Sequence, residues 1–365
     1  MCGVSVSAKM QYAQLTEIRA EDTRVTSVYR ECEDAALRRL DLAMQAFFRR
    51  CKRGQTPGFP RFKPASGWKQ ITFPHGDRAL KFSENQRRVR VPGVGDVKLR
   101  KGRSVPGSFG RGWIVEKNDR WYLCVEHEVK VKPIRAIRKV LGVDRGVHVL
   151  AATSDGDLIR NLAAGEKRKR GTARLQRDLD SRTLKSSDGR CLNRKDPARI
   201  AAVKRLARAK EHEANARRDY AHKISRRLVD SADCIGIEAL RLLNMTRSAK
   251  GTIEKPGVNV RAKSGLNRVM LDAGFGLLQQ MIAYKAESAG VTVVAVDPRF
   301  SSQECSRCGH VARESRRRMR YECVACGFTC HADVNAALVI RERAQLALSR
   351  VPDAGADPVR LHDAA

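Results

Sequence analysis

Apolar residues with helical spacing appear early in the chain and again in its second half. From Val28 to Phe47 they recur every three or four positions, so one helical face is apolar while Arg and Glu lie on the other. The same spacing predicts a helix from about Val269 to Ala289. Three prolines and three glycines lie between residues 54 and 67, which predicts a loop and a domain edge there.

Short alternating runs replace the helical spacing between residues 68 and 132. The runs KQITF, RRVRVPGVGDVKLR and DRWYLCVEHEVKV are separated by Gly, Pro and Asn-Asp turns, which predicts a small antiparallel β-barrel or sheet. Arg88 and Arg90 alternate with two valines. We therefore expect one basic, solvated face here that can bind a nucleic-acid backbone.

Strands and helices alternate in the second half of the chain. KVLGVDRGVHVLAATSDGDLIR predicts three strands with tight turns, SADCIGIEAL predicts a short buried strand that ends at Glu238, and VTVVAVD predicts a buried parallel strand. Helical spacing appears between residues 160 and 230, and VNAALVIRERAQLALS predicts a last helix. This order predicts an α/β domain, and the residues after Val351 are expected to form a frayed tail.

The charge balance points to a polyphosphate partner. The 365 residues hold 72 Lys plus Arg and 40 Asp plus Glu, a formal net charge of +32, which favours nucleic acid. Residues 160–230 hold 22 basic and 9 acidic side chains, a net charge of +13, whereas a solvated hairpin without a partner would mix its signs more evenly. We see neither an apolar run long enough to span a membrane nor a secretion signal, and expect a cytoplasmic protein with no membrane partner.

Four of the eleven cysteines form two Cys-x-x-Cys pairs, Cys305 with Cys308 and Cys323 with Cys326. This spacing lets four thiolates surround one Zn²⁺ as a tetrahedron, and a closed set of four is typical of structural zinc. Cys330 is a candidate fifth ligand, although a small buried residue is the commoner role. The histidines at 310 and 331 are expected to be bystanders beside a complete set. Arginines between the two pairs are candidate phosphate contacts: Arg313, Arg316, Arg317, Arg318 and Arg320.

Three acids share a position at the ends of predicted elements. Asp144 lies at the end of an apolar strand, Glu238 ends another strand, and Asp333 begins the last helix. They are 94 and 95 residues apart, so only a fold could bring them together. Clustered carboxylates need cations, and Mg²⁺ prefers hard oxygen ligands and keeps positions open for phosphate. Two such ions about 3.5–4 Å apart can activate a water and stabilise a departing 3′-oxygen, which is nuclease chemistry.

Each acid also has an ordinary structural alternative. Asp333 could cap the helix N-terminus, Asp144 could be a turn residue, and Glu238 could pair with one of the many arginines. Their joint placement in a strongly basic chain favours the catalytic interpretation.

The motifs together resemble one family. GVDRGVHVLAATSDG, IGIEALRLLNMTRSAKGT, SSQECSRCGH and YECVACGFTCHADVNAAL, in that order and spacing, are similar to segments of the TnpB proteins, the OrfB-type proteins of insertion sequences and relatives of type V CRISPR nucleases. LRRLDLAMQAFFRR and GFPRFKP upstream extend the resemblance over most of the chain. Older descriptions call these proteins transposases.

The resemblance implies an α/β RNase H-like nuclease domain of the RuvC type with Asp144, Glu238 and Asp333 as its Mg²⁺ ligands. It also implies an RNA-guided DNA endonuclease that takes its guide RNA from the transposon end and recognises a short motif beside the target. The implied domains are a helical recognition region (1–54), a wedge-like β-barrel (55–136), the nuclease domain (137–300 and 331–350), an inserted zinc ribbon (301–330) and a flexible tail (351–365).

The chain departs from the family pattern at its beginning. The family has a further strand and helix before the region that matches QYAQLTEIRA, so the resemblance implies a shortened N-terminus and a missing first strand of the barrel. Two alternatives to the guided nuclease stay open: a catalytically impaired remnant that only binds nucleic acid, and a transposase that transfers DNA strands with the same acids.

Overall fold

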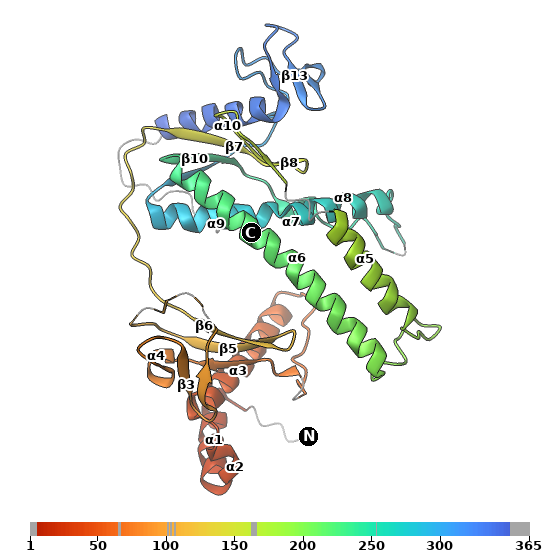
Figure 1. Ribbon diagram of the computed structural model, residues 1–365. Coiled ribbons are helices and arrows are strands. Elements are labelled where there is room, and N and C mark those ends of the chain that lie inside the picture. The colour runs from red at the N-terminus through yellow and green to blue at the C-terminus, as the bar shows by residue number, and fades with distance from the viewer. Residues whose placement is uncertain are drawn as a thin grey trace. The chain divides into compact units, whose positions relative to one another are not determined.

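The structure, a computed structural model, describes residues 6–64, 67–100, 102, 104–105, 107–161, 166–252 and 254–350. The chain divides into two units, Met1–Val129 and Lys130–Ala365, which are described separately (Figure 1). The tail expected after residue 350 lies outside the described residues. Within the part that the structure describes, no helix is both long and apolar enough to cross a membrane.

The first unit contains helices followed by two small antiparallel sheets. The helices are α1 (Ala8–Glu21), α2 (Thr23–Thr26), α3 (Arg30–Lys52) and α4 (Gly76–Ala79). One sheet has the order β1 (Gln70–Phe73), β5 (Gly112–Lys117), β6 (Arg120–Val125), and the other the order β2 (Lys81–Phe82), β3 (Arg88–Val91), β4 (Gly95–Lys98). The helix predicted from residue 28 is confirmed and continues to Lys52.

The predicted alternation in the first unit is present on β3. Val89 and Val91 are buried in a core that also contains Phe73 and Leu80, whereas Arg88 and Arg90 are exposed. The pairing among the described residues gives two three-stranded sheets that share this core. It does not join their strands into one closed barrel.

The second unit is built on a five-stranded mixed sheet with the order β11-β10-β7-β8-β9 (Figure 1). Its strands are β7 (Val140–Asp144), β8 (Val149–Thr153), β9 (Leu158–Arg160), β10 (Cys234–Glu238) and β11 (Thr292–Val296). β10 runs parallel to both β7 and β11, while β7, β8 and β9 form an antiparallel meander. The three-strand meander and the two later parallel strands are confirmed, but β11 is a half-buried edge strand where a fully buried one was expected.

The helices of this unit are α5 (Glu166–Ser181), α6 (Pro197–Asp230), α7 (Leu242–Met245), α8 (Val260–Ala273), α9 (Phe275–Ala289) and α10 (Ala332–Ser349). α10 covers one face of the sheet, α6 and α9 pack against the other, and α5 packs on α6. The expected helix from Val269 to Ala289 is wrong in extent: the chain forms two helices that are interrupted at Gly274, and the first of them already begins at Val260. Helical spacing continues through the interruption, so periodicity alone could not locate it.

The two faces differ in how closely the helices approach. Leu141 and Val143 on β7 belong to the apolar core formed with α6 and α9. The intervening Gly142 faces α10, and a Cβ there would lie 2.0 Å from the carbonyl oxygen of Ala337. Gly236 on β10 likewise faces α10, where an added Cβ would lie 2.8 Å from Ala344. The two glycines thus allow α10 to lie against the sheet at backbone distance.

A small ribbon connects β11 to α10. It contains the short helix η2 (Arg313–Ser315) and the antiparallel strands β12 (Arg316–Arg317), β13 (Arg320–Glu322) and β14 (Thr329–His331). Tyr321 is fully buried and packs with Cys305, Cys323 and Ala332. The ribbon therefore has a core of its own that reaches the first residue of α10.

Candidate acid site and zinc centre

Two of the predicted acids lie on the same face of neighbouring parallel strands. Ile237 on β10 pairs with Val143 on β7 in parallel register, so the next residues, Glu238 and Asp144, lie side by side on the two strands. Side chains alternate along a strand, which places both acids on the α10 face with Gly142, two residues earlier on β7. Glu238 is buried and Asp144 is half-buried.

The third acid comes from the helix that crosses this face. Ala337 is the residue of α10 closest to Gly142, and Asp333 precedes Ala337 by four residues, which is about one helical turn. Asp144 follows Gly142 by two residues along the strand. Asp333 therefore lies near Asp144, and its charge acts on the Asp144 carboxyl group.

The electrostatics of Asp144 reflect this convergence. Burial is the largest cause that raises its pKa, followed by the negative charges of Glu238 and Asp333, and together they raise the pKa of Asp144 to about 7. The positive charges of Arg316 and Arg145 oppose this rise. Such a cluster is short of positive charge, and oxygen ligands of this kind suit Mg²⁺.

Asp333 does not cap the helix. The cap of α10 is His331, whose Nδ1 accepts a hydrogen bond from the Asp333 backbone N–H at 3.2 Å. The Asp333 carboxylate instead accepts a hydrogen bond from Arg316 Nη2 of the ribbon at 2.9 Å, and the two side chains are 16% and 31% exposed. The guanidinium thus provides part of the positive charge that a cation would supply at this acid.

A second arginine is buried beneath the acids. Arg145 is 5% exposed, its Nη2 donates to the Glu238 carbonyl oxygen at 2.7 Å, and its Nη1 donates to Gln279 on α9. Burial is the main cause that lowers its pKa, while the charges of Glu238 and Asp144 act in the opposite direction. Arg145 therefore ties the ends of β7 and β10 to α9 next to the carboxylates.

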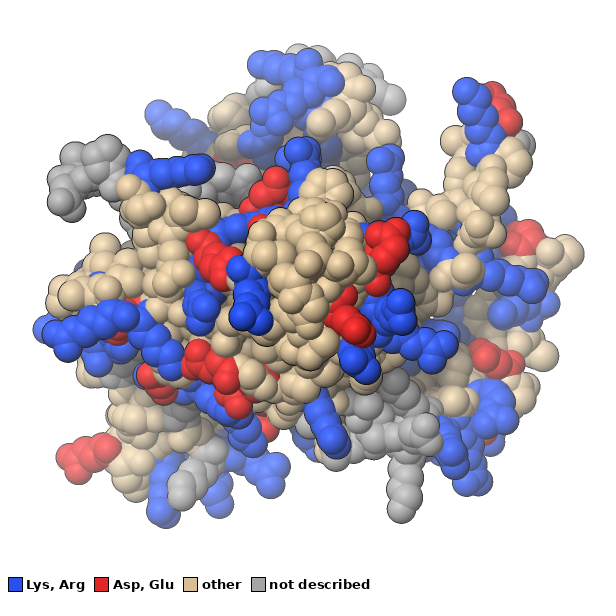
Figure 2. Space-filling view, turned by 90° about the horizontal axis from the view of Figure 1, so that it is seen from above, with Lys and Arg blue, Asp and Glu red and all other residues tan. Residues whose placement is uncertain are grey.

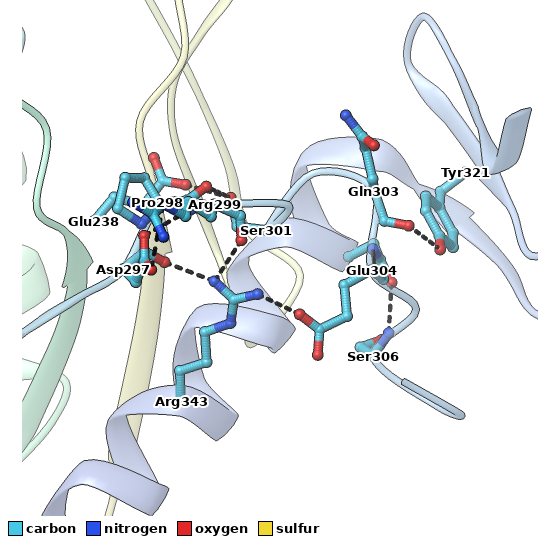
Figure 3. A network of polar contacts seen from close by, with 11 residues as sticks. Glu238, Asp297, Pro298, Arg299, Ser301, Gln303, Glu304, Ser306, Tyr321 and Arg343 are labelled. Atoms are coloured by element: carbon cyan, nitrogen blue, oxygen red, sulfur yellow. Dashed lines mark hydrogen bonds and ion pairs between the residues drawn. The ribbon is translucent and has the colours of Figure 1, made fainter. Parts of the chain in front are cut away.

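The side chain of Glu238 is held from the loop that enters the ribbon (Figure 3). Ser301 Oγ donates to Glu238 Oε1, and Ser301 itself is buried. Arg343 of α10 donates to two backbone carbonyl groups of the same loop, those of Asp297 and Arg299. This places Glu238 at the junction of β10, the loop and α10.

The four paired cysteines form a compact centre in the ribbon. Their sulfur atoms all lie within 4.8 Å of one another, with 3.7 Å between Cys305 and Cys326 and 3.6 Å between Cys308 and Cys323. A tetrahedron with Zn–S bonds of about 2.3 Å has edges of about 3.8 Å, so the four thiolates fit one zinc ion. Among the described residues no other group of His, Cys, Asp or Glu is as tightly clustered, the three acids included.

Both halves of this centre use the same turn. The backbone N–H of Cys305 donates to the carbonyl oxygen of His310, and that of Cys323 donates to Phe328, each at 2.9 Å. The residue after each second cysteine is a glycine with positive φ, 71° and 67°. Backbone N–H groups, first that of Cys326, lower the pKa of the Cys323 thiol to about 6, which favours the metal-binding thiolate. Cys330 is half-buried against the ribbon core and lies outside the group.

The predicted nucleic-acid contacts have different surroundings. Arg88 and Arg90 are exposed on one side of β3, and Arg313, Arg317 and Arg318 are exposed on the ribbon. Of the other two candidates, Arg320 is exposed and pairs with Glu322, and Arg316 is paired with Asp333. Figure 2 shows Lys and Arg side chains spread over the viewed face with fewer acidic ones between them, in keeping with the formal charge of +32.

Sequence patterns did not single out three residues of the site: Arg145, Ser301 and Arg343. Arg145 directly follows the first acid, and Ser301 stands four residues before the first cysteine, but neither position has a motif that specifies a partner. Their partners lie 93 and 63 residues away, at distances along the chain that only the fold can close.

Two family models match segments of the chain, and two relatives align with most of it. Residues 122–249 match the model of a probable transposase, OrfB of the IS605 type, and residues 275–340 match a Cas12f1-like TNB domain. InsQ of Escherichia coli (strain K12), named as a proposed RNA-guided DNA endonuclease, is 34% identical over 304 residues, which cover 83% of this chain and 71% of InsQ. A protein of Streptomyces pristinaespiralis with the same proposed activity is 28% identical over 92% of this chain and 75% of its own length.

A third relative is more distant. The CRISPR-associated endodeoxyribonuclease Cas12f1 of Sulfoacidibacillus thermotolerans is 27% identical over 61% of this chain, which spans 50% of that protein. The mixed sheet, the clustered acids and the four-cysteine group describe an α/β protein with a ribbon whose four cysteines could hold zinc. The chain belongs to the TnpB family, in which relatives are named as RNA-guided DNA endonucleases and transposases.

Proposed function

We propose that this protein is an RNA-guided DNA endonuclease of the RuvC type that hydrolyses phosphodiester bonds with Mg²⁺ held by Asp144, Glu238 and Asp333. The observation that carries the proposal is the convergence of the three acids, two in register on parallel strands and one on the helix that crosses them. Acids that are 94 and 95 residues apart have no local reason to meet.

The residues present fit such a metal. Three carboxylates share one region, and burial together with the two neighbouring negative charges raises the pKa of Asp144 to about 7, so added positive charge is favoured there. The Arg316 guanidinium paired with Asp333 supplies part of that charge. When bound, Mg²⁺ supplies an activated water and a counter-charge for the departing 3′-oxygen. The chain's own part is to hold the carboxylates in place: Arg145 and Ser301 each bond to Glu238, and Arg316 bonds to Asp333.

Other parts of the chain have roles in the same proposal. The nuclease domain would comprise residues 137–300 and 331–350 with the ribbon, 301–330, as a structural insertion. The helices of residues 1–54 and the sheets of 55–136 would grip a guide RNA from the transposon end and the DNA motif beside the target. Arginines on β3 and on the ribbon are exposed, so they can bind phosphates of the RNA and of the DNA.

The experiment that tests the activity is cleavage by the protein purified with its bound RNA. Asp144→Asn removes one charge from the acid site, so we expect Mg²⁺-dependent cutting to fall by more than about 100-fold while nucleic-acid affinity stays within about two-fold. Asp155→Asn is a matched control, because Asp155 is exposed and pairs with Lys139 away from the acids. Equal cutting by Asp144→Asn and Asp155→Asn contradicts the proposal.

The same preparation distinguishes the alternatives. Sequencing of the bound RNA should give one dominant species with a variable segment at one end. The constant part is the part that the protein binds, and the variable segment is the part that pairs with the target DNA. Mixed RNA without cutting would favour a protein that only binds nucleic acid. DNA joined to a free 3′-hydroxyl end in the products would favour a strand-transferring transposase.

A further inference from the structure

The Glu238 carboxylate is the acid of the site that receives a hydrogen bond from a buried hydroxyl (Figure 3). Ser301 is 3% exposed, and its Oγ lies within hydrogen-bond distance of Glu238 Oε1 across 63 residues of sequence. Both groups are withdrawn from water, so a carboxylate without this donor would lose a bond that solvent could not replace. The contact therefore has a larger effect than a hydroxyl at the surface would have.

The hydroxyl has one proton and two acceptors within reach. The second acceptor is the carbonyl oxygen of Pro298, at 3.1 Å. A carboxylate is the stronger acceptor because it is charged, so the Ser301 proton goes to Glu238. The bond fixes the rotation of the carboxylate, which can still bind a cation through its other oxygen.

Arg343 fixes the loop that carries Ser301 (Figure 3). Its Nη1 donates to the carbonyl oxygens of Asp297 and Arg299 at 2.6 and 2.8 Å, and its Nη2 pairs with Glu304. These contacts lie before and after Ser301 in the sequence. The side chains of Arg343 and Glu304 are 23% and 25% exposed, so solvent screens this pair less than one at the open surface.

The loop is also tied to the zinc centre. Asn335 of α10 is fully buried, its side-chain nitrogen donates to the Glu304 carbonyl oxygen at 2.7 Å, and its side-chain oxygen accepts from the Ser306 N–H. Ser306 lies between the first two zinc-site cysteines, Cys305 and Cys308. The first cysteine turn, the loop and α10 are thus connected by hydrogen bonds.

We propose that Ser301 is a positioning residue for Glu238 and that Arg343 holds Ser301 in place. The loop of residues 297–304, which enters the ribbon, thereby sets the affinity of the acid site for a divalent cation. The proposal rests on the function proposed above. Removing a residue that hydrogen-bonds to a metal ligand lowers metal affinity about 10–100-fold, and this is the effect expected for Ser301.

The test measures binding of Mn²⁺, a paramagnetic substitute for Mg²⁺, to the full chain with zinc in place. We expect Ser301→Ala to weaken Mn²⁺ binding by about 10-fold or more, and Ser301→Thr, which keeps a hydroxyl, to restore it. The neighbouring Ser302 is the matched control, and Ser302→Ala should bind as the unchanged protein does. Arg343→Lys keeps the charge but not the planar fork, so it should weaken binding by an intermediate factor.

Asp144→Ala separates this proposal from the function beneath it. If Asp144→Ala binds Mn²⁺ as the unchanged protein does, the cation does not bind at the acids, and the proposed function and the role of Ser301 both fail. If Asp144→Ala loses binding while Ser301→Ala behaves like Ser302→Ala, only the role of Ser301 is overturned. Zinc content is measured for every variant. Should Ser301→Ala lose zinc, Arg343→Lys with full zinc decides, since unchanged affinity there overturns the proposal.

Discussion

The four-cysteine centre and the acid site are both clusters of ionisable ligands in the second unit, yet they are built in opposite ways. The four cysteines lie within 22 residues, and two equal turns bring their sulfur atoms within 4.8 Å of one another. The three acids span 190 residues and do not form so tight a group. One site is specified by local spacing, and the other by strand register and by a helix laid over two glycines.

This difference has energetic consequences. A small ribbon with four cysteines gains most of its folding stability from the metal, because the free energy of zinc binding adds to the free energy of folding. The acid site is held by the sheet whether or not a cation is bound, and Arg145, Arg316 and Ser301 already satisfy part of it. We therefore expect zinc loss to unfold a segment, and loss of the divalent cation to leave the fold intact.

Removal of zinc should produce the largest effect. Structural zinc sites contribute about 10–16 kcal/mol of apparent binding free energy, so Cys308→Ser should unfold the ribbon. Hydrogen exchange should become fast in residues 303–331 while β7 and β10 stay protected. Cys330→Ser is the control, because Cys330 lies outside the four-sulfur group and should keep zinc. Protection of the ribbon in Cys308→Ser would mean that the apolar core around Tyr321 suffices.

A methyl group at Gly142 should damage the acid site and spare the zinc centre. Its Cβ would lie 2.0 Å from the Ala337 carbonyl oxygen and 2.6 Å from the Arg341 nitrogen, so α10 must move away from β7. We expect Gly142→Ala to lower the free energy of unfolding by about 1–3 kcal/mol or more, with weaker Mn²⁺ binding and normal zinc content.

The control for this change is Gly171→Ala on α5. Gly171 has open space around it, so alanine there should raise stability by up to about 1 kcal/mol through helix propensity. Chemical denaturation of the two variants gives the comparison. Equal stability of Gly142→Ala and the unchanged protein would show that α10 can shift without cost.

The smallest effect should be a pH dependence without divalent cation. The pKa of Asp144 is raised to about 7 from an ordinary value of 3.8, so the folded protein binds more protons than the unfolded chain between these pH values. The contribution of Asp144 to stability is therefore complete below about pH 4 and is lost as the pH rises through about 7. Asp144→Asn should flatten this decline and be the more stable protein at pH 8, as followed by thermal unfolding with zinc retained. An unchanged slope in Asp144→Asn would assign the decline to other groups.

Prediction from the sequence succeeded where the signal is local. Each correctly predicted feature depends on residues close to it in the sequence. These features are the two Cys-x-x-Cys pairs, the alternating RVRV strand and the strand endings at Asp144 and Glu238. It failed where packing decides, as in the interrupted helix at Gly274 and the half-buried edge strand β11. The roles of Arg145 and Ser301 depend on partners that no spacing rule connects. The catalytic role of the acids and the domain boundaries remain predictions.

The direct junction of the ribbon with α10 restricts how the chain length can vary. β14 ends at His331 and α10 begins at the next residue, so no spacer separates the zinc-binding insertion from the helix that bears Asp333. One residue inserted here would turn the helix by about 100° relative to the ribbon and point the acid away from the sheet. The loop between α5 and α6, by contrast, carries no residue of either site. Length variation among descendants of this chain should therefore accumulate between those two helices and be absent at the ribbon's exit.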